Sequence, residues 1–159
     1  MKTNVAIVDV NRLSARQLQK LKKLVESLGG DPDSIVECMR EMTQYAVLSS
    51  KTDNILSILS IRPRGKSYCG EMYTNMIYNV VTSPYHRKKG YMTILMKHLI
   101  RELKTQKKRC AHLEVLKDNK NAIRFYKKLG FKIIDRCISP HFSYIMRLRL
   151  HSKGQCDDE

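Results

Sequence analysis

Residues 80–92 read VVTSPYHRKKGYM, and this stretch joins an apolar strand to an amphipathic helix. The strand begins at Met72 and ends at Thr82, before Pro84 breaks it. A basic turn follows, and then a helix is predicted. The residues of one face recur at helical spacing: Ile94, Leu95, His98, Leu99 and Leu103. Residues 111–116 form another short apolar strand. The order strand, helix, strand predicts two parallel strands with a right-handed crossover.

The flanking sequence extends this unit in both directions. The patterns before it predict strands over residues 4–10, 45–50 and 55–61, and helices over residues 13–28 and 31–42. The patterns after it predict a helix over residues 119–129, closed by Gly130, and strands over residues 131–138 and 143–150. The whole order is that of an α/β (α+β) protein.

The composition is that of a globular domain. The chain has 159 residues, of which 42% are hydrophobic and 28% charged, with 7 Gly and 4 Pro. These values exclude a disordered chain, a collagen and a membrane protein, and the length suits one core. We therefore expect a single domain over residues 1–150 and a polar, frayed tail over residues 151–159.

Positive charge is concentrated in the second part of the chain. Of the 30 basic residues, 22 lie after residue 60, against 8 acidic ones there, and the formal net charge is +15. A charge of this size predicts attraction to an anion: nucleic acid, lipid headgroups or a phosphorylated ligand. The sequence places that anion site after residue 60.

Cysteine usage and the start of the chain indicate a compartment. The five cysteines are odd in number and lack the spacing of a zinc site, so we expect free thiols; they are Cys38, Cys69, Cys110, Cys137 and Cys156. The first ten residues contain an apolar run too short for a signal peptide, and no stretch approaches about 18 apolar residues. These features predict a cytoplasmic protein and no membrane span.

The turn from Arg87 to Gly90 has the properties of a phosphate site. Consecutive backbone N–H groups at a helix start attract anions, and Gly90 permits close approach of the backbone. The alternative is a basic loop that only begins a helix.

Residues 113–131 read LEVLKDNKNAIRFYKKLGF and predict a strand end followed by an amphipathic helix. By itself, this pattern needs no function to explain it: an amphipathic helix that packs on a sheet, with Ile123 and Tyr126 partly buried, has the same pattern.

Together, in this order, the two segments resemble the GNAT superfamily of acetyl-CoA-dependent N-acetyltransferases. The turn is similar to the signature Arg/Gln-x-x-Gly-x-Gly/Ala, at Arg87, Gly90 and Met92. The later segment is similar to Asn-x-x-Ala-x-x-x-Tyr-x-x-x-Gly-Phe, at Asn119, Ala122, Tyr126, Gly130 and Phe131. Met92 departs from the small residue usual there.

The resemblance implies a fold and a cofactor. The fold is a mixed, mostly antiparallel sheet with a central parallel pair and helices on both faces. The cofactor is acetyl-CoA, with no metal, and its binding residues are Val80, Val81, Thr82, Arg87, Lys88, Lys89, Gly90, Tyr91, Met92 and Asn119. Of these, Val80 to Thr82 would lie beside the pantetheine arm, and Asn119 would contact that arm, cap the helix or do both.

The resemblance also implies an acid and a base. The spacing of Glu114 and Tyr126 is similar to that of the ribosomal-protein alanine N-acetyltransferase branch, where the glutamate is the base and the tyrosine protonates the departing thiolate. A base is useful because an alkyl ammonium, with a pKa of about 10.4, must lose a proton before it attacks. The alternatives are an ion-paired strand glutamate and a buried structural tyrosine.

The expected acceptor is a primary amine of a peptide, a protein or a small molecule such as a polyamine or amino sugar. Four acids of the second predicted helix could attract a cationic acceptor or simply begin an exposed helix: Asp31, Asp33, Glu37 and Glu41. Two other functions remain open, a basic nucleic-acid-binding module and an inactive acetyl-CoA-binding relative. With no Trp and 3 Phe, nucleic acid is the weaker partner. We expect a monomer or homodimer.

Overall fold

The computed structural model describes residues 4–49, 52, 54–138, 141–151 and 156. Its contacts divide the chain into two compact units, residues 1–61 with 79–101, and residues 62–78 with 102–159. No helix in the described part of the chain is long and apolar enough to cross a membrane.

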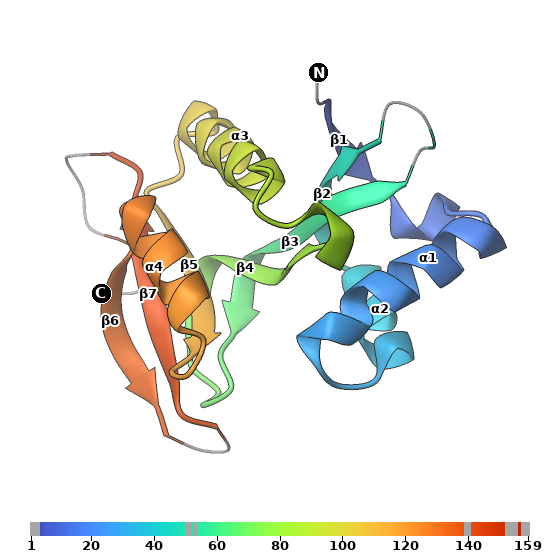
Figure 1. The fold of residues 1–159 in the computed structure, drawn as a ribbon. Helices are drawn as coiled ribbons and strands as arrows, with labels where there is room; N and C mark the ends of the chain where they lie inside the picture. Colours follow the sequence, from blue (N-terminus) through green and yellow to red (C-terminus); the bar gives the residue numbers. More distant parts are fainter. Residues whose placement is uncertain (1–3, 50–51, 53, 139–140, 152–155, 157–159) are drawn as a thin grey trace. The chain divides into compact units, whose positions relative to one another are not determined.

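Seven strands hydrogen-bond in the order β1-β2-β3-β4-β5-β7-β6 (Figure 1). The strands are β1 (Val5–Val8), β2 (Thr43–Leu48), β3 (Ile55–Lys66), β4 (Met72–Thr82), β5 (Cys110–Leu116), β6 (Lys132–Cys137) and β7 (Ser143–Arg149). The helices are α1 (Ala15–Val25), α2 (Pro32–Met39), α3 (Tyr91–Thr105) and α4 (Lys120–Lys128), with short 3₁₀ turns at Val10–Arg12, Glu26–Leu28 and Pro84–His86. This α/β fold, with its mostly antiparallel sheet, agrees with the expectation from the sequence.

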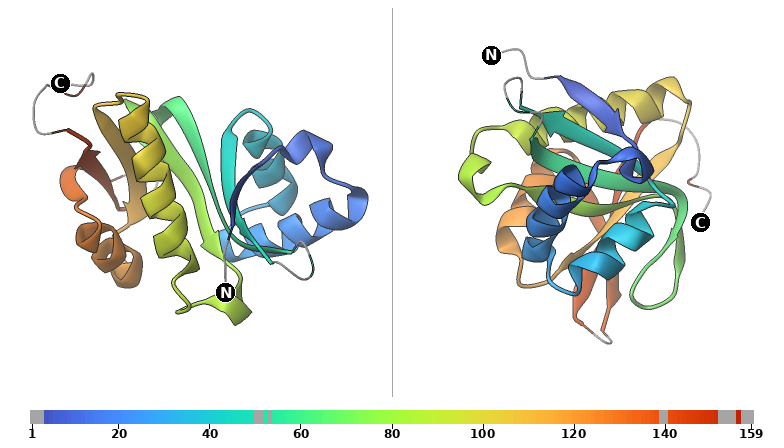
Figure 2. Two further views of the ribbon diagram at one scale, coloured as in Figure 1. Left: turned by 90° about the horizontal axis from the view of Figure 1, so that it is seen from above. Right: turned by 90° about the vertical axis from the view of Figure 1, so that its right-hand side faces the viewer.

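In the first unit, helices cover β1, β2 and β3 (Figure 2). Leu21 and Val25 of α1 and Met39 of α2 are buried in one core with Ala46 of β2 and Ile58 of β3. Tyr45, the neighbour of Ala46, contacts the ring of His98 on α3, with 5.8 Å between centroids. Successive strand residues point to opposite faces, so α1 and α2 pack on one face and α3 on the other.

In the second unit, the predicted parallel pair is present. β4 pairs with β5 in parallel at Met76↔His112 and Ile77↔Leu113, whereas β5 pairs with β7, and β7 with β6, in antiparallel register. Met76 and Ile145 are buried together with Tyr73. Helix α4 lies across β5 and β7 (Figure 1).

Polar caps determine where the helices begin. Ser14 and Gln17 form a capping box at α1, and the Asp31 carboxylate accepts from the Ser34 amide at α2. Such caps satisfy backbone N–H groups that have no partner inside a helix. At the far end of α4, Gly130 has φ +97°, the left-handed conformation expected from the sequence.

Strand β3 is longer than the predicted 55–61, because it continues through Pro63 and Gly65 to Lys66. A Cβ at Gly65 would lie 2.6 Å from the Cβ of Met76 and would also overlap the hydroxyl of Tyr78. Glycine here therefore lets β3 and β4 approach closely. The predicted strand stopped short because the apolar run ends at Ile61.

The expectation of free thiols is wrong for four of the five cysteines. Disulfides join Cys69 to Cys137 and Cys110 to Cys156, with Cα–Cα separations of 5.6 and 5.8 Å that lie in the usual range. Cys38 is free and exposed. Disulfides persist in oxidising surroundings, so the cytoplasmic assignment loses the support that it drew from cysteine usage.

The C-terminal tail is described only at His151 and Cys156. His151 is exposed, whereas Cys156 is buried and bonded to Cys110. The remaining residues of the predicted frayed tail lie outside the described part of the chain.

Candidate functional site

The first group of predicted site residues lies in the first unit, where β4 ends. Asn79 has φ +52°, a left-handed conformation typical of a β-bulge, and its side-chain amide donates to the Ser60 hydroxyl at 3.3 Å. The next residues are the predicted pantetheine contacts: Val81 is buried, and Val80 and Thr82 are half-buried. The change in backbone direction therefore falls immediately before these contacts.

The turn between β4 and α3 has two left-handed residues, Lys88 at φ +60° and Gly90 at φ +80°. A Cβ built on Gly90 would meet nothing within 4 Å, so open space lies against the backbone there. The first bond of α3 runs from the Ile94 amide to the Gly90 carbonyl. The amides before Ile94 have no carbonyl acceptor inside the helix, and the helix dipole adds partial positive charge. This geometry is suited to an anion.

The cations of the turn are accessible. Arg87, Lys88 and Lys89 are all exposed, and Arg87 donates from Nε to the Thr82 carbonyl at 3.4 Å. Tyr91 is half-buried, with its ring 6.3 Å from that of His86. Charge and backbone donors thus occur in the same short segment.

Met92 turns its sulfur toward β3. Its Sδ lies 3.9 Å from the Ser57 hydroxyl, which also contacts the Val81 carbonyl at 3.2 Å and the Thr82 hydroxyl at 2.8 Å. The longer side chain is therefore accommodated against strand residues while the space at Gly90 stays open.

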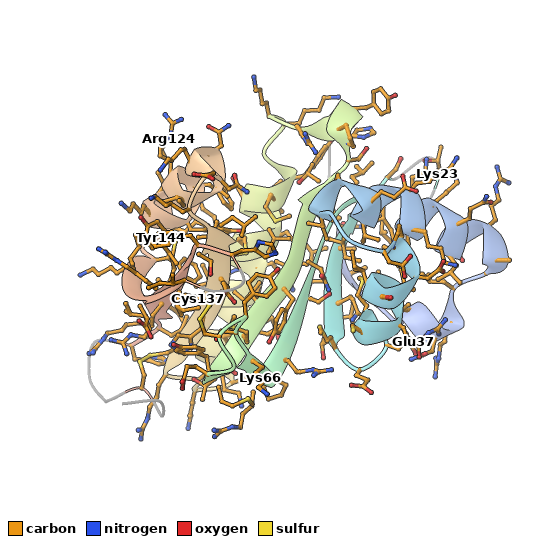
Figure 3. All side chains as sticks on the ribbon, turned by 90° about the horizontal axis from the view of Figure 1, so that it is seen from below. Lys23, Glu37, Lys66, Arg124, Cys137 and Tyr144 are labelled. Atoms are coloured by element: carbon orange, nitrogen blue, oxygen red, sulfur yellow. A yellow bond between two sulfur atoms is a disulfide. The ribbon has the colours of Figure 1, made fainter. Side chains whose placement is uncertain are left out.

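The second group lies in the second unit, on β5 and α4. The Asn119 side chain accepts from the Ala122 amide at 3.2 Å, which makes it the N-cap of α4. Of the roles expected for Asn119, the cap is present in the structure. Arg124, further along α4, points away from the sheet (Figure 3).

Tyr126 is only 6% exposed and is enclosed by aromatic rings. Its centroid lies 5.4 Å from that of Phe125 and 5.9 Å from that of Phe131. Burial raises the pKa of the Tyr126 phenol well above its ordinary value. The hydroxyl carries its proton at neutral pH, as an ordinary phenol does, and has this proton to donate.

Glu114 is a half-buried residue of β5 whose two carboxylate oxygens both accept hydrogen bonds. The Tyr68 amide donates to Oε2 at 2.8 Å, and the buried Ser143 hydroxyl donates to Oε1. These contacts differ from the lysine pair considered as the alternative. A carboxylate has about four lone-pair sites, so Glu114 can still accept a further hydrogen bond.

The acids near α2 have partners inside the first unit, as three of them illustrate. Asp33 is paired with Lys22, and Glu37 with Arg40 at 2.9 Å. Hydrogen bonds from the hydroxyl and amide of Ser34 lower the pKa of Asp31. Figure 3 shows Glu37 on α2 among other surface side chains. These pairings favour a structural role over attraction of a cationic acceptor.

Sequence reasoning missed three groups that hold the site residues: Ser57, the Tyr68 amide and Ser143. Ser57 and Ser143 are completely buried. A serine inside an apolar strand run must find a partner for its hydroxyl, and this was the available signal. Nothing in the sequence pointed to the Tyr68 amide, because every residue but proline has one.

Comparison with known proteins identifies a family for this chain. The acetyltransferase (GNAT) family matches residues 18–131. No curated protein sequence matches the chain significantly. The chain therefore belongs to the acetyltransferase (GNAT) family, and by this membership it is an enzyme that transfers acetyl groups.

Solved structures have the same fold at low sequence identity. A putative GNAT acetyltransferase from Desulfovibrio desulfuricans is 14% identical, with a TM-score of 0.72 over 94% of this chain and 100% of that one. The ribosomal-protein-S18-alanine N-acetyltransferase from Escherichia coli is 16% identical, with a TM-score of 0.70 over 97% of both chains. A putative acetyltransferase from Salmonella typhimurium, solved with acetyl-CoA, is 16% identical, with a TM-score of 0.68 over 98% of both chains.

Proposed function

We propose that this protein transfers the acetyl group of acetyl-CoA to a primary amine, which attacks the thioester directly. Acetyl-CoA supplies an activated acetyl group whose leaving group is a thiolate. The residues of the chain bind its phosphates, remove a proton from the amine and return a proton to the sulfur.

The observation that supports acetyl-CoA most strongly is the turn at Arg87–Gly90. It combines open space at the Gly90 Cβ position with accessible cations and the amides of a helix start. Phosphate oxygens fit such a cradle, because backbone amides and the helix dipole stabilise negative charge. No side chain at Gly90 blocks their access to these amides. The position of the Met92 sulfur, against Ser57, leaves this cradle free and weighs against an inactive relative.

We assign Tyr126 as the general acid. Its phenol carries a proton at neutral pH, and the rings of Phe125 and Phe131 contact its own ring, which is almost completely buried. As the C–S bond breaks, the hydroxyl donates this proton to the thiolate.

We assign Glu114 as the base. The two donors fix the orientation of its carboxylate, and an acceptor site remains on the oxygens. Accepting the ammonium proton generates the neutral amine that attacks. In Glu114→Gln we expect the largest loss of acetylation rate at low pH. Part of the rate should return as the pH rises toward the pKa of the acceptor amine.

We propose a peptide or protein α-amine as the first acceptor to examine. An α-amino group, with a pKa of about 7.7–8.0, loses its proton much more easily than a lysine side chain. The similarity in fold to an alanine N-acetyltransferase is consistent with this choice. The pairing of the α2 acids removes the main sequence argument for a polycationic small molecule.

The direct experiment is an acceptor panel in which mass spectrometry locates the transferred acetyl group. It contains an alanine-initiated peptide, the same peptide with a blocked N-terminus and an internal lysine, spermidine and glucosamine. We expect acetylation of the free α-amine and none of the blocked peptide.

Acetylation of spermidine or glucosamine alone would replace the α-amine by a small-molecule acceptor. Release of CoA from no member of the panel, with acetyl-CoA bound, would favour the inactive relative.

A further inference from the structure

The most unusual feature outside the proposed chemistry is the attachment of one surface loop to Glu114. Residues 67–71 connect β3 to β4 in a tight turn, with the Ser67 amide bonded to the Glu71 carbonyl at 2.8 Å and the Gly70 amide to the Ser67 carbonyl at 3.0 Å. The second residue of this loop, Tyr68, is the one whose amide donates to Glu114 Oε2. The loop therefore contacts β5 through a carboxylate, in addition to its own internal bonds.

A covalent bond fixes the same loop at the adjacent residue. Cys69 is bonded to Cys137 at the end of β6, and the two positions are 68 residues apart in sequence. The ring of Tyr68 also meets that of His141 edge-on, 6.2 Å between centroids. Cys69 is exposed and Cys137 is buried. A reductant can thus approach this disulfide from the Cys69 side. In the other disulfide, both Cys110 and Cys156 are buried.

The second donor to Glu114 belongs to the sheet itself. Ser143 is the first residue of β7, where it pairs with Leu116 of β5 and Cys137 of β6. Its hydroxyl donates to Glu114 Oε1. Because Ser143 is completely buried between two paired strands, this donor does not depend on the loop.

We infer that Ser143 and the Tyr68 amide are positioning groups that clamp the Glu114 carboxylate, and that the Cys69–Cys137 disulfide holds the Tyr68 arm of this clamp in place. The inference rests on the proposed function insofar as Glu114 is the base. Its consequence is an activity that depends on the redox state of one disulfide.

The redox step requires a dithiol reductant. The dithiol transfers two electrons and two protons to the Cys69–Cys137 disulfide, so that two cysteine thiols form and the dithiol closes to its own disulfide. The loop then loses its bond to β6, and the Tyr68 amide is no longer fixed opposite Oε2. The Ser143 arm remains, so reduction lowers kcat by about three- to tenfold rather than abolishing it.

The first test needs no acceptor. Hydrogen exchange at the Tyr68 amide is measured by NMR in the oxidised protein and after reduction by dithiothreitol, in a Cys156→Ser background that leaves Cys69–Cys137 as the only described disulfide. We expect reduction to accelerate exchange at Tyr68 by about tenfold or more while Leu113, inside β5, is unchanged. Equal exchange rates at Tyr68 in both states would overturn the role of the disulfide.

The second test is a double-mutant cycle in kinetics, with acetyl-CoA and the alanine-initiated peptide, and acetylated peptide counted by mass spectrometry. Ser143→Ala should lower kcat about tenfold without changing KM for acetyl-CoA. In a Glu114→Gln background, Ser143→Ala should lower kcat by less than about twofold, because the carboxylate that Ser143 positions is absent. Equal losses of kcat in both backgrounds would show that Ser143 has only a structural role, and would overturn the proposed clamp.

Ser67→Ala is the matched control. It removes another buried hydroxyl, one that has no hydrogen-bond partner among the residues described by the structure. We expect wild-type kcat for this variant. A Glu114→Gln enzyme with wild-type rates would refute the base assignment itself, whereas the exchange result at Tyr68 stands or fails independently.

Discussion

Tyr126 combines a protonated hydroxyl with a ring that is almost wholly enclosed. If this hydroxyl protonates the thiolate, Tyr126→Phe removes the acid and leaves the ring packing intact. We expect turnover to fall by about 10²-fold or more with KM for acetyl-CoA nearly unchanged. Steady-state kinetics with the accepted peptide measures both constants. An unchanged turnover would assign Tyr126 to the core alone.

The burial of Tyr126 also predicts a pH dependence of stability. Below about pH 10 the phenol is protonated in the folded and the unfolded chain, so it adds no pH dependence. Above that pH the unfolded chain releases the proton, but the folded chain keeps it because burial raises the pKa. Folding therefore loses stability as the pH rises.

Urea unfolding of the wild type and of Tyr126→Phe, from pH 8 to pH 11, measures this effect. The difference in free energy of unfolding should be constant up to about pH 9.5. Above about pH 10 it should shift in favour of the phenylalanine variant by up to about 1.4 kcal/mol per pH unit. Parallel curves over the whole range would mean that the hydroxyl is open to solvent.

The β4–α3 turn can be tested with an internal control, because two glycines have the same positive φ. Gly90 and Gly29 both have φ +80°, and a Cβ on either would meet nothing within 4 Å. Valine at either position should cost similar stability, since a β-branched residue is strained at positive φ. Only Gly90→Val should lose acetyl-CoA affinity, by about 10²-fold or more, because only there does the side chain occupy the phosphate cradle.

Calorimetric titration with acetyl-CoA, with melting curves alongside, compares the two variants. Equal affinity for both would remove the turn from the binding site. Equal loss in both would indicate that the strain, and not the cradle, weakens binding.

Local signals were sufficient for most elements. Asn119 is the N-cap of α4, and Gly130 is the left-handed stop after this helix, as their positions in the sequence indicated. The extension of β3 through Gly65 was not predictable, because it depends on contact with Met76 and Tyr78 of the neighbouring strand. Likewise, the donors to Glu114 lie 46 and 29 residues away from it, beyond any local pattern.

Over the whole chain, composition and topology were informative, but pairings between distant residues were not. The paired signatures predicted the mixed sheet with its parallel β4–β5 contact. Five scattered cysteines gave no basis for the pairs Cys69–Cys137 and Cys110–Cys156, because connectivity is decided by the folded backbone. For the same reason, the sequence did not show that Asp33 is paired with Lys22 of α1.

The charge asymmetry has a simple use if the anion is acetyl-CoA. Most of the excess positive charge follows residue 60, and the exposed cations Arg87, Lys88 and Lys89 belong to that part. Positive potential around the cradle would speed the arrival of a phosphorylated ligand, and salt would weaken this effect.

The most direct test of the central claim is calorimetric titration of the wild-type protein with acetyl-CoA at low salt. The account predicts one site with micromolar affinity, and a melting temperature that rises with ligand concentration as mass action requires. Absence of both heat and thermal shift at millimolar acetyl-CoA would contradict it, whatever amine is supplied.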